Sequence, residues 1–204
     1  METIHRRFSS QFRSHWIKVK FYKEYPLLKN VKRLEGVRFC EATKKAILYP
    51  VLLDKESINC PGAQYAFGWV CSLEERNELL NCCQDKRRTQ KSIVESMLSY
   101  IPHLKEPPKF IGLNTDGEPD LMMSYLVPEE VMNLLKIFHN RQGKNMDVSI
   151  CSMMSVCGGV AVRTYLEERV SFSFGCDDSR KYAQIGRDRL AIGIPKKLFK
   201  IFVD

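Results

Sequence analysis

The sequence contains no long hydrophobic run. No apolar stretch approaches the roughly 20 residues that a helix needs to cross a bilayer, and the opening METIHRRFSSQF lacks the apolar core of a secretory signal. We therefore expect a chain without a membrane span that stays in the cytoplasm. In that reducing compartment its eight cysteines are expected to stay free, bind metal or take part in chemistry rather than form disulfides.

Several motifs of ligand-binding proteins are also absent. The chain has no G-x-G-x-x-G and no P-loop sequence, so a nucleotide cofactor has no support. Its four histidines show no His-x-x-x-His spacing, and no two cysteines have the C-x₂₋₄-C spacing of a zinc knuckle. The signatures of RNA-binding and helix-turn-helix domains are missing too, which disfavours nucleic acid as a partner.

The net charge of +8 is concentrated at the start of the chain. Residues 1–33 hold nine Lys or Arg and two Glu, a net charge of +7, and the rest of the chain carries only +1. Such a segment can attract nucleic acid, an anionic membrane or an acidic partner. We favour a solvated basic face and keep a basic binding module for an anionic partner as an alternative.

Strand and helix patterns interleave along the chain, which predicts a single α/β domain over residues 1–204, or an α+β domain, with helices packed on a mixed sheet. Alternating apolar residues predict strands over 16–22, within the basic segment, and over 51–53, 109–113, 121–127, 171–174 and 190–195. Helical spacing and capping residues predict helices over 3–14, 40–48, 72–99, 128–140, 157–168 and 195–202, and another that starts at 61.

Four cysteines stand where an extended or irregular segment turns into a predicted helix, namely Cys40, Cys60, Cys157 and Cys176. A thiol at a helix start lies near the positive end of the helix dipole and near free backbone N–H groups. Both stabilise the thiolate, the form that binds metals and acts as a nucleophile. A single cysteine of this kind is more often a core residue, but four in one small domain predict a shared metal site.

The spacing of these cysteines favours an iron–sulfur cluster, of the 4Fe–4S type, with zinc as the alternative. Dispersed single cysteines must be gathered by the fold into a preformed pocket. The neighbouring glycines Gly62, Gly158 and Gly175 are expected to let the backbone approach this cofactor closely. Cys151 is a rival to Cys157 as a ligand. If only three cysteines bind, one iron is open to a substrate, as in an oxidoreductase or a sulfur-transfer enzyme with an unidentified small-molecule or redox partner.

Polar residues crowd the turn that follows Cys176. In the functional interpretation, Arg180 binds an anionic substrate or the cluster and Asp178 moves protons. The alternative is that the acidic residues merely cap a helix.

Three further cysteines lie outside the predicted metal site. We interpret Cys71, Cys82 and Cys83 as structural or exposed thiols.

The second hypothesis for the whole chain is a metal-free enzyme in which one cysteine of low pKa, either Cys60 or Cys176, attacks the substrate.

From about Trp16 to its C-terminus the chain resembles the family called Domain of Unknown Function 169, or archaeal conserved region. The motifs that carry the resemblance are VRFCEATKKA (37–46), INCPGAQYAFGW (58–69), PDLMMSYLVPEEVMNLL (119–135), SVCGG (155–159) and FGCDDSR (174–180). Asp178 departs from the pattern, because family members more often have a small residue there. The resemblance implies a cysteine-rich protein associated with anaerobes and names no reaction or substrate.

Overall fold

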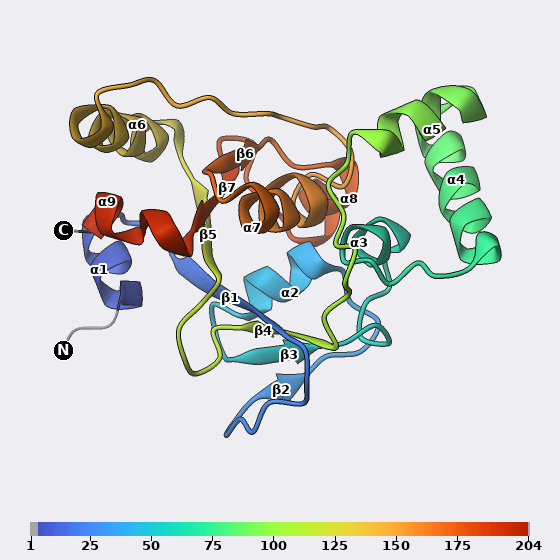
Figure 1. Cartoon of the computed structure of the whole chain (residues 1–204), viewed down its shortest axis with the longest axis horizontal. Helices are drawn as coiled ribbons and strands as arrows, with labels where there is room; N and C mark the ends of the chain where they lie inside the picture. The colour runs from blue at the N-terminus through green and yellow to red at the C-terminus, as the bar shows by residue number, and fades with distance from the viewer. Residues whose placement is uncertain (1–3, 204) are drawn as a thin grey trace.

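The computed structural model describes residues 4–203, and one seven-stranded mixed sheet runs through them (Figure 1). The strands lie in the order β2-β3-β4-β1-β5-β7-β6. β2 pairs with β3 in parallel, and every other neighbouring pair is antiparallel. The strands are β1 (Trp16–Tyr22), β2 (Lys32–Arg33), β3 (Val51–Leu53), β4 (Phe110–Leu113), β5 (Leu121–Leu126), β6 (Ser171–Ser173) and β7 (Leu190–Pro195). The predicted α/β class with a mixed sheet is confirmed.

Helices cover both faces of this sheet. They are α1 (Ile4–Gln11), α2 (Phe39–Lys45), α3 (Pro61–Ala66), α4 (Leu73–Arg87), α5 (Lys91–Ser99), α6 (Pro128–Gln142), the π-helix η1 (Cys157–Val162), α7 (Arg163–Glu167), α8 (Asp177–Tyr182), the 3₁₀-helix η2 (Lys196–Leu198) and α9 (Phe199–Val203). In Figure 1, α1, α6 and α9 gather at one end of the molecule, and α4 and α5 extend at the other. Within residues 4–203, no helix is both long and apolar enough to cross a membrane.

Two hydrophobic cores lie on the two faces of the sheet, and the alternation along β5 shows the division. Met123 and Tyr125 belong to one core, which we call the cysteine face because it also contains Cys40 and Cys157. Met122 belongs to the other core, which we call the aromatic face. Its buried aromatic residues are Phe8, Phe12, Trp16, Phe138, Phe172, Phe199 and Phe202. Successive strand residues point to opposite faces, so one strand supports both cores.

Most predicted elements are confirmed, and the differences have local causes. The predicted helix 72–99 is two helices, because Arg88 adopts a left-handed conformation at φ 51° between α4 and α5. The predicted helix 157–168 begins as a π-helix, and the closing helix begins as a 3₁₀ turn. The predicted helix over 3–14 is observed as α1, and Thr3, where it was expected to start, lies outside the described residues.

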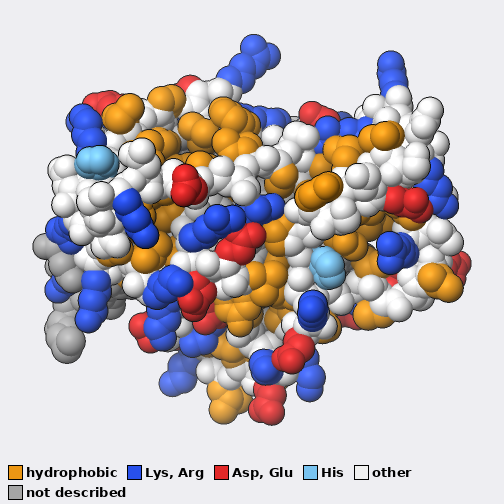
Figure 2. Space-filling model, turned by 45° about the horizontal axis from the view of Figure 1, so that its top comes forward, with side chains coloured by type: hydrophobic (Ala, Val, Ile, Leu, Met, Phe, Trp, Pro, Cys, Tyr) orange, Lys and Arg blue, Asp and Glu red, His pale blue; other side chains and the backbone are white. Residues whose placement is uncertain are grey.

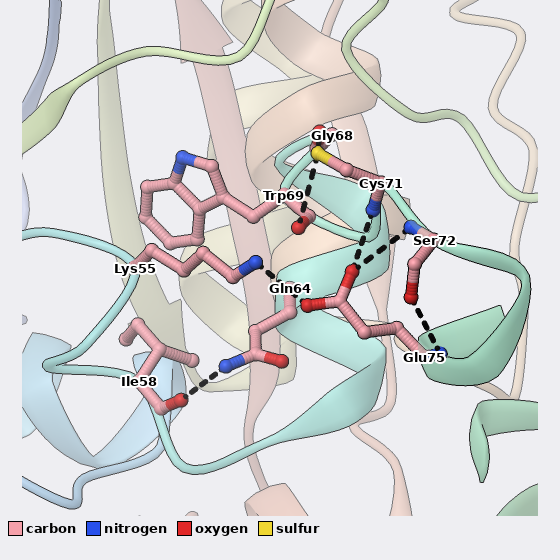
Figure 3. A network of polar contacts seen from close by, with 8 residues as sticks. All are labelled: Lys55, Ile58, Gln64, Gly68, Trp69, Cys71, Ser72 and Glu75. Atoms are coloured by element: carbon pink, nitrogen blue, oxygen red, sulfur yellow. Dashed lines mark hydrogen bonds and ion pairs between the residues drawn. The ribbon is translucent and has the colours of Figure 1, made fainter.

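The start of α4 is fixed by the capping box that the sequence predicts (Figure 3). The Glu75 carboxylate accepts hydrogen bonds from the backbone N–H of Cys71, at 2.7 Å, and of Ser72, at 3.1 Å, and the Ser72 hydroxyl accepts one from the Glu75 N–H. Lys55 forms an ion pair with the same carboxylate at 2.7 Å. These contacts tie α4 to the segment before Cys60 and so set which face of α4 turns inward.

Candidate functional site

The four predicted cysteines line a single cavity of about 90 Å³, the cysteine cavity. Cys40 comes from α2, Cys60 precedes α3, Cys157 opens η1, and Cys176 precedes α8. These segments are far apart in the sequence and meet on the cysteine face of the sheet. The fold therefore gathers the dispersed thiols, as the metal hypothesis requires.

Each of these cysteines stands at a helix start, as predicted. Cys60 is the N-cap of α3 and is followed by Pro61 in the first turn, where proline's missing N–H costs nothing. Cys176 is the N-cap of α8, and Cys40 is the second residue of α2. Cys157 is the first residue of the π-helix.

Burial nevertheless outweighs the helix starts in the metal-free protein. It raises the pKa of Cys40 to about 12 and raises the pKa of Cys60 and of Cys157. Backbone N–H groups act in the opposite direction, from Ala63 on Cys60 and from Gly158 on Cys157, and they are too weak to reverse the shift. The backbone N–H groups favour the thiolate, as predicted, but burial has the larger influence on these three thiols, because the neutral form is favoured away from water.

The four thiols are close enough for their charges to repel one another. Negative charge on Cys60, Cys176 and Cys40 raises the pKa of Cys157, and charge on Cys176 and Cys60 raises the pKa of Cys40. Cys176 raises the pKa of Cys60 in the same way. All six pairs among the four cysteines therefore interact, and a positively charged group in the cavity would relieve every one of these repulsions at once.

The arrangement does not match the binding of a single metal ion. Across residues 4–203, no group of three or more His, Cys, Asp or Glu side chains is placed so that it could hold one ion. A zinc site needs four ligands about 2.0–2.3 Å from a common point. In an iron–sulfur cluster each thiolate binds a different iron, so its cysteines lie farther apart around one cavity. Thiolates are soft ligands that select iron–sulfur clusters, copper(I) or zinc, and the choice of a cluster over zinc stays a prediction.

The cavity contains sulfur that the sequence interpretation missed. Cys82 and Cys83 of α4 line it, together with Met153 and Met154. Burial raises the pKa of Cys83 to about 11, and charge on Cys60 contributes to this rise. The interpretation of Cys82 and Cys83 as merely structural or exposed therefore overlooked their position. The signal was present in the spacing of α4, where Leu79, Cys82, Cys83, Lys86 and Arg87 lie on one helical face and line the cavity together.

Charged residues form the rim of the cavity, and Asp178 is their centre. Its carboxylate lies 2.8 Å from the Lys86 Nζ and 3.4 Å from the Arg38 Nε. The Arg38 guanidinium in turn stacks on the Tyr182 ring at 3.6 Å. Partial burial raises the pKa of Asp178, but Lys86 and Arg38 together outweigh it and hold that pKa below its ordinary value. Asp178 is therefore ionised at neutral pH and links Lys86 and Arg38 at the rim, and the proton transfer predicted for it stays a prediction.

The predicted role of Arg180 is not supported by its contacts. Its guanidinium donates hydrogen bonds to the backbone carbonyls of Ile185, Gly186 and Arg189. These contacts hold the loop before β7, and Arg180 is not among the residues that line the cysteine cavity. The cations on the cavity wall are instead Arg38, Lys86 and Arg87.

Of the three predicted glycines, only Gly62 lines the cavity. A Cβ on Gly158 would meet Ile101 Cγ2 at 2.8 Å and Ala66 at 3.5 Å, so this glycine permits close packing of η1 against α3 and the 101–110 loop. Gly175 has φ +87°, a conformation that residues with a side chain rarely adopt. The geometry thus gives Gly158 and Gly175 packing and turn roles and no approach to a cofactor.

Cys157 is better placed than its rival Cys151. Both thiols donate to a backbone carbonyl, Cys157 to Met154 at 3.5 Å and Cys151 to Met153 at 3.4 Å, but only Cys157 is among the residues that line the cavity. Cys71 is exposed, and its thiol donates to the Trp69 carbonyl at 3.5 Å. Cys71 and Cys151 therefore serve as natural control positions.

The basic segment does not form one continuous surface. It runs from α1, beside α9, through the central strand β1 to β2 at the edge of the sheet (Figure 1). Several of its cations have partners, including Lys23 with Glu106 at 3.1 Å and Lys32 over the Tyr49 ring at 4.0 Å. On the face shown in Figure 2, Lys and Arg side chains are interspersed with acidic and hydrophobic ones. This distribution favours the solvated-face interpretation.

The fold and the site together define a mixed α/β protein with a buried, cysteine-lined cavity. The family profile described as Domain of Unknown Function 169, uncharacterised ArCR, matches residues 11–204, and the chain belongs to this family. No curated protein and no solved structure shows significant similarity to the chain. The family membership predicted from the motifs is confirmed, and it brings no reaction with it.

Proposed function

We propose that the protein binds an iron–sulfur cluster of the 4Fe–4S type through Cys40, Cys60, Cys157 and Cys176, and that it has a redox or sulfur-handling role in the cytoplasm. The observation that carries the proposal is the convergence of these four thiols, from four separate segments, on one cavity in which all of them interact. A cluster in that position supplies one-electron chemistry or, with an open iron, a site for a sulfur-containing substrate.

The size and chemistry of the cavity support an inorganic group over an organic substrate. Pockets for organic ligands typically measure roughly 300–1,000 Å³, and the cysteine cavity measures about 90 Å³. Its wall offers thiols and thioethers, the soft ligands that select iron–sulfur clusters, copper(I) or zinc. A cluster bound by four thiolates carries negative charge. The wall holds three cations, Arg38, Lys86 and Arg87, and two carboxylates, Asp177 and Asp178, so an excess of one positive charge faces such a cluster.

The two alternatives have weaker support. A metal-free enzyme needs a nucleophilic thiol of lowered pKa, whereas burial raises the pKa of Cys60, one of the two candidate nucleophiles. A basic binding module needs clustered, unpaired cations, whereas those of residues 1–33 are spread across the sheet and partly paired. Zinc in place of a cluster has the difficulty that no single-ion arrangement occurs among residues 4–203.

The test is anaerobic purification and cluster reconstitution, followed by analysis of iron, sulfide and zinc. We expect about four iron and four sulfide per chain, as a 4Fe–4S cluster contains. Cys60→Ser and Cys176→Ser should lose most of this iron and the associated visible absorption. Cys71→Ser, at an exposed thiol, and Cys151→Ser, at the rival position, should retain it.

Three outcomes would contradict the proposal. A wild-type protein with no iron or sulfide after reconstitution would reject the cluster, and one that takes up zinc alone would move the assignment to a zinc site. If Cys60→Ser and Cys176→Ser fold, as shown by circular dichroism, and bind as much iron as Cys71→Ser, these cysteines are not ligands.

A further inference from the structure

A second cavity of about 660 Å³ lies beside the first, and we call it the Arg189 cavity. It is built from the turn between α1 and β1, from α2, from the turn between β5 and α6, and from Arg189 just before β7. Its volume falls in the range of roughly 300–1,000 Å³ that is typical of organic ligand sites. Neither the family membership nor the cysteine hypothesis accounts for it.

Two hydrogen bonds hold the Arg189 guanidinium at this cavity, and its other nitrogens remain available as donors. One of its terminal nitrogens, Nη1, donates to the Tyr125 carbonyl at 2.8 Å and to the Ser14 hydroxyl oxygen at 3.1 Å. Its Nε and Nη2 have no hydrogen-bond partner within residues 4–203. The side chain is half-buried, so its position is fixed by the protein while two N–H edges remain available. Such a fork matches the two oxygens of a carboxylate.

The acid nearest to Arg189 is already occupied by other donors. The Glu130 carboxylate accepts from the Ser14 N–H at 2.8 Å, from the Ser14 hydroxyl at 2.5 Å and from the Val127 N–H at 3.2 Å. Partial burial raises the pKa of Glu130, but these hydrogen bonds and the charge of Arg189 hold it below its ordinary value. Glu130 thus links the α1–β1 turn to α6. Among the described residues, its carboxylate does not form an ion pair with Arg189 within 4 Å.

The rim adds positive charge that forms no ion pair with the residues of 4–203. Arg13 and Lys44 are exposed at the cavity and form no ion pair within the described part of the chain, and Glu129 is the exposed acid beside them. Three cations and two carboxylates therefore face the cavity, an excess of one positive charge. Phe12, Ile47 and Val127 supply apolar wall. The excess matches a ligand with one negative charge and an apolar body.

Tyr125 separates this cavity from the cysteines. Its carbonyl faces Arg189, and its hydroxyl lies 2.6 Å from the Thr43 hydroxyl on α2, the helix that carries Cys40. The Thr43 proton goes to the Cys40 carbonyl at 2.7 Å, so the Tyr125 O–H is the donor of the pair. A ligand bound at Arg189 thus lies one tyrosine away from the cysteine cavity.

We propose that the Arg189 cavity binds a small organic monocarboxylate, with the carboxylate on Arg189 and Lys44 and the body against the apolar wall. The proposal does not depend on whether the cysteine cavity holds a cluster. It identifies the chemical class of ligand that the protein brings next to its thiols.

The test uses three probes of one shape on the full-length protein: phenylacetate, the neutral phenylacetamide and phenyl phosphate. We expect phenylacetate to bind saturably and to shift the backbone amide signals of Ser14 and Val127 in an NMR titration. Phenylacetamide should bind at least about tenfold more weakly, because it lacks the charge-assisted hydrogen bonds. Tighter binding of phenyl phosphate than of phenylacetate would overturn the assignment to carboxylates.

Variants locate the site without removing its framework. Arg189→Lys keeps the charge, loses the fork and should weaken phenylacetate about tenfold. Lys44→Gln should weaken it several-fold and leave phenylacetamide unchanged. The matched control is Lys45→Gln, next to Lys44 on α2 and ion-paired with Glu41 at 2.8 Å. Equal affinity in Lys44→Gln and Lys45→Gln, or no saturable binding to the folded wild type, would overturn the proposal.

Discussion

The cores on the two faces of the sheet are built from different kinds of side chain. The aromatic face is filled by large rings in direct contact, such as Phe8 with Trp16 at 4.7 Å and with Phe199 at 5.7 Å between ring centroids. The cysteine face also contains ring contacts, such as Phe39 with Phe67 at 4.9 Å, but it adds thiols and methionines around a cavity, and a π-helix passes through it. A cavity lowers stability, so the cysteine cavity weakens the packing of the face that contains it, whereas the ring contacts of Phe8 contribute to stability directly.

The largest expected effect concerns the aromatic face alone. Phe8→Ala should lower the free energy of unfolding by about 3–5 kcal/mol, the usual cost of removing a fully buried ring, because Phe8 is completely buried. Urea denaturation measures this loss. Leu27→Ala, at a side chain that is 97% exposed, is the control and should stay within about 0.5 kcal/mol.

The same variant tests whether the two faces have separate roles. After reconstitution below the denaturation midpoint, folded Phe8→Ala should carry as much iron per chain as the wild type. A loss of iron in proportion to the loss of stability would mean that the comparison between the faces is wrong.

A smaller effect distinguishes two glycines on the cysteine face. Gly158→Ala should cost about 1–3 kcal/mol through overpacking, because the new methyl group meets Ile101 at 2.8 Å inside a fully buried helix. Gly62→Ala meets only the flexible Met154 side chain, at 2.9 Å, and should stay within about 1 kcal/mol of the wild type. Thermal or urea unfolding of both variants checks this difference, and equal costs would contradict it.

A further effect, spread over a wide range of pH, is a dependence of stability on pH. The pKa of Cys40 is raised from 9.0 to about 12 in the folded protein, so above pH 9 the unfolded chain releases a proton that the folded chain keeps. The contribution is complete below about pH 9 and is lost between pH 9 and 12, at roughly 1.4 kcal/mol per pH unit for one thiol. The free energy of unfolding of the metal-free protein should therefore fall with rising pH across this window.

Cys40→Ala provides the comparison for that slope. It should make the decline shallower, whereas Cys71→Ala, at an exposed thiol, should leave it unchanged. Urea titrations at several pH values between 8 and 11, a window chosen around the pKa values of folded and unfolded thiols, provide the measurement. Identical slopes in wild type and Cys40→Ala would show that Cys40 does not titrate in this way.

The sequence predicted the features that depend on neighbours along the chain. Strand alternation in WIKVKFY, the capping box of Ser72 and Glu75, and the helix starts at the four cysteines are all local patterns, and the structure contains them. The gathering of the cysteines could also be inferred, because four similar positions in one small domain are more simply explained by one site than by four.

The features that were missed depend on contacts between distant segments. Arg180 follows Cys176 closely in sequence, yet its guanidinium donates hydrogen bonds to carbonyls of the 185–189 loop. These contacts depend on the conformation of that loop, which the sequence near Cys176 does not determine. The effect of burial on the thiol pKa values also depends on the whole core. The Arg189 cavity is lined by residues as far apart in the sequence as Ser14 and Arg189. No local sequence pattern predicts it.

The π-helix at Cys157 has a consequence for insertions and deletions in this family. Its wide turns are made by hydrogen bonds from Gly159 N–H to the Met154 carbonyl and from Ala161 N–H to the Val156 carbonyl, each spanning five residues. An α-helix spans four, so the segment holds one residue more than a regular helix needs. Deleting a single residue there would restore regular winding and rotate Cys157 by roughly 100° about the helix axis. Chain length at this point therefore sets where the Cys157 side chain lies on the cavity wall.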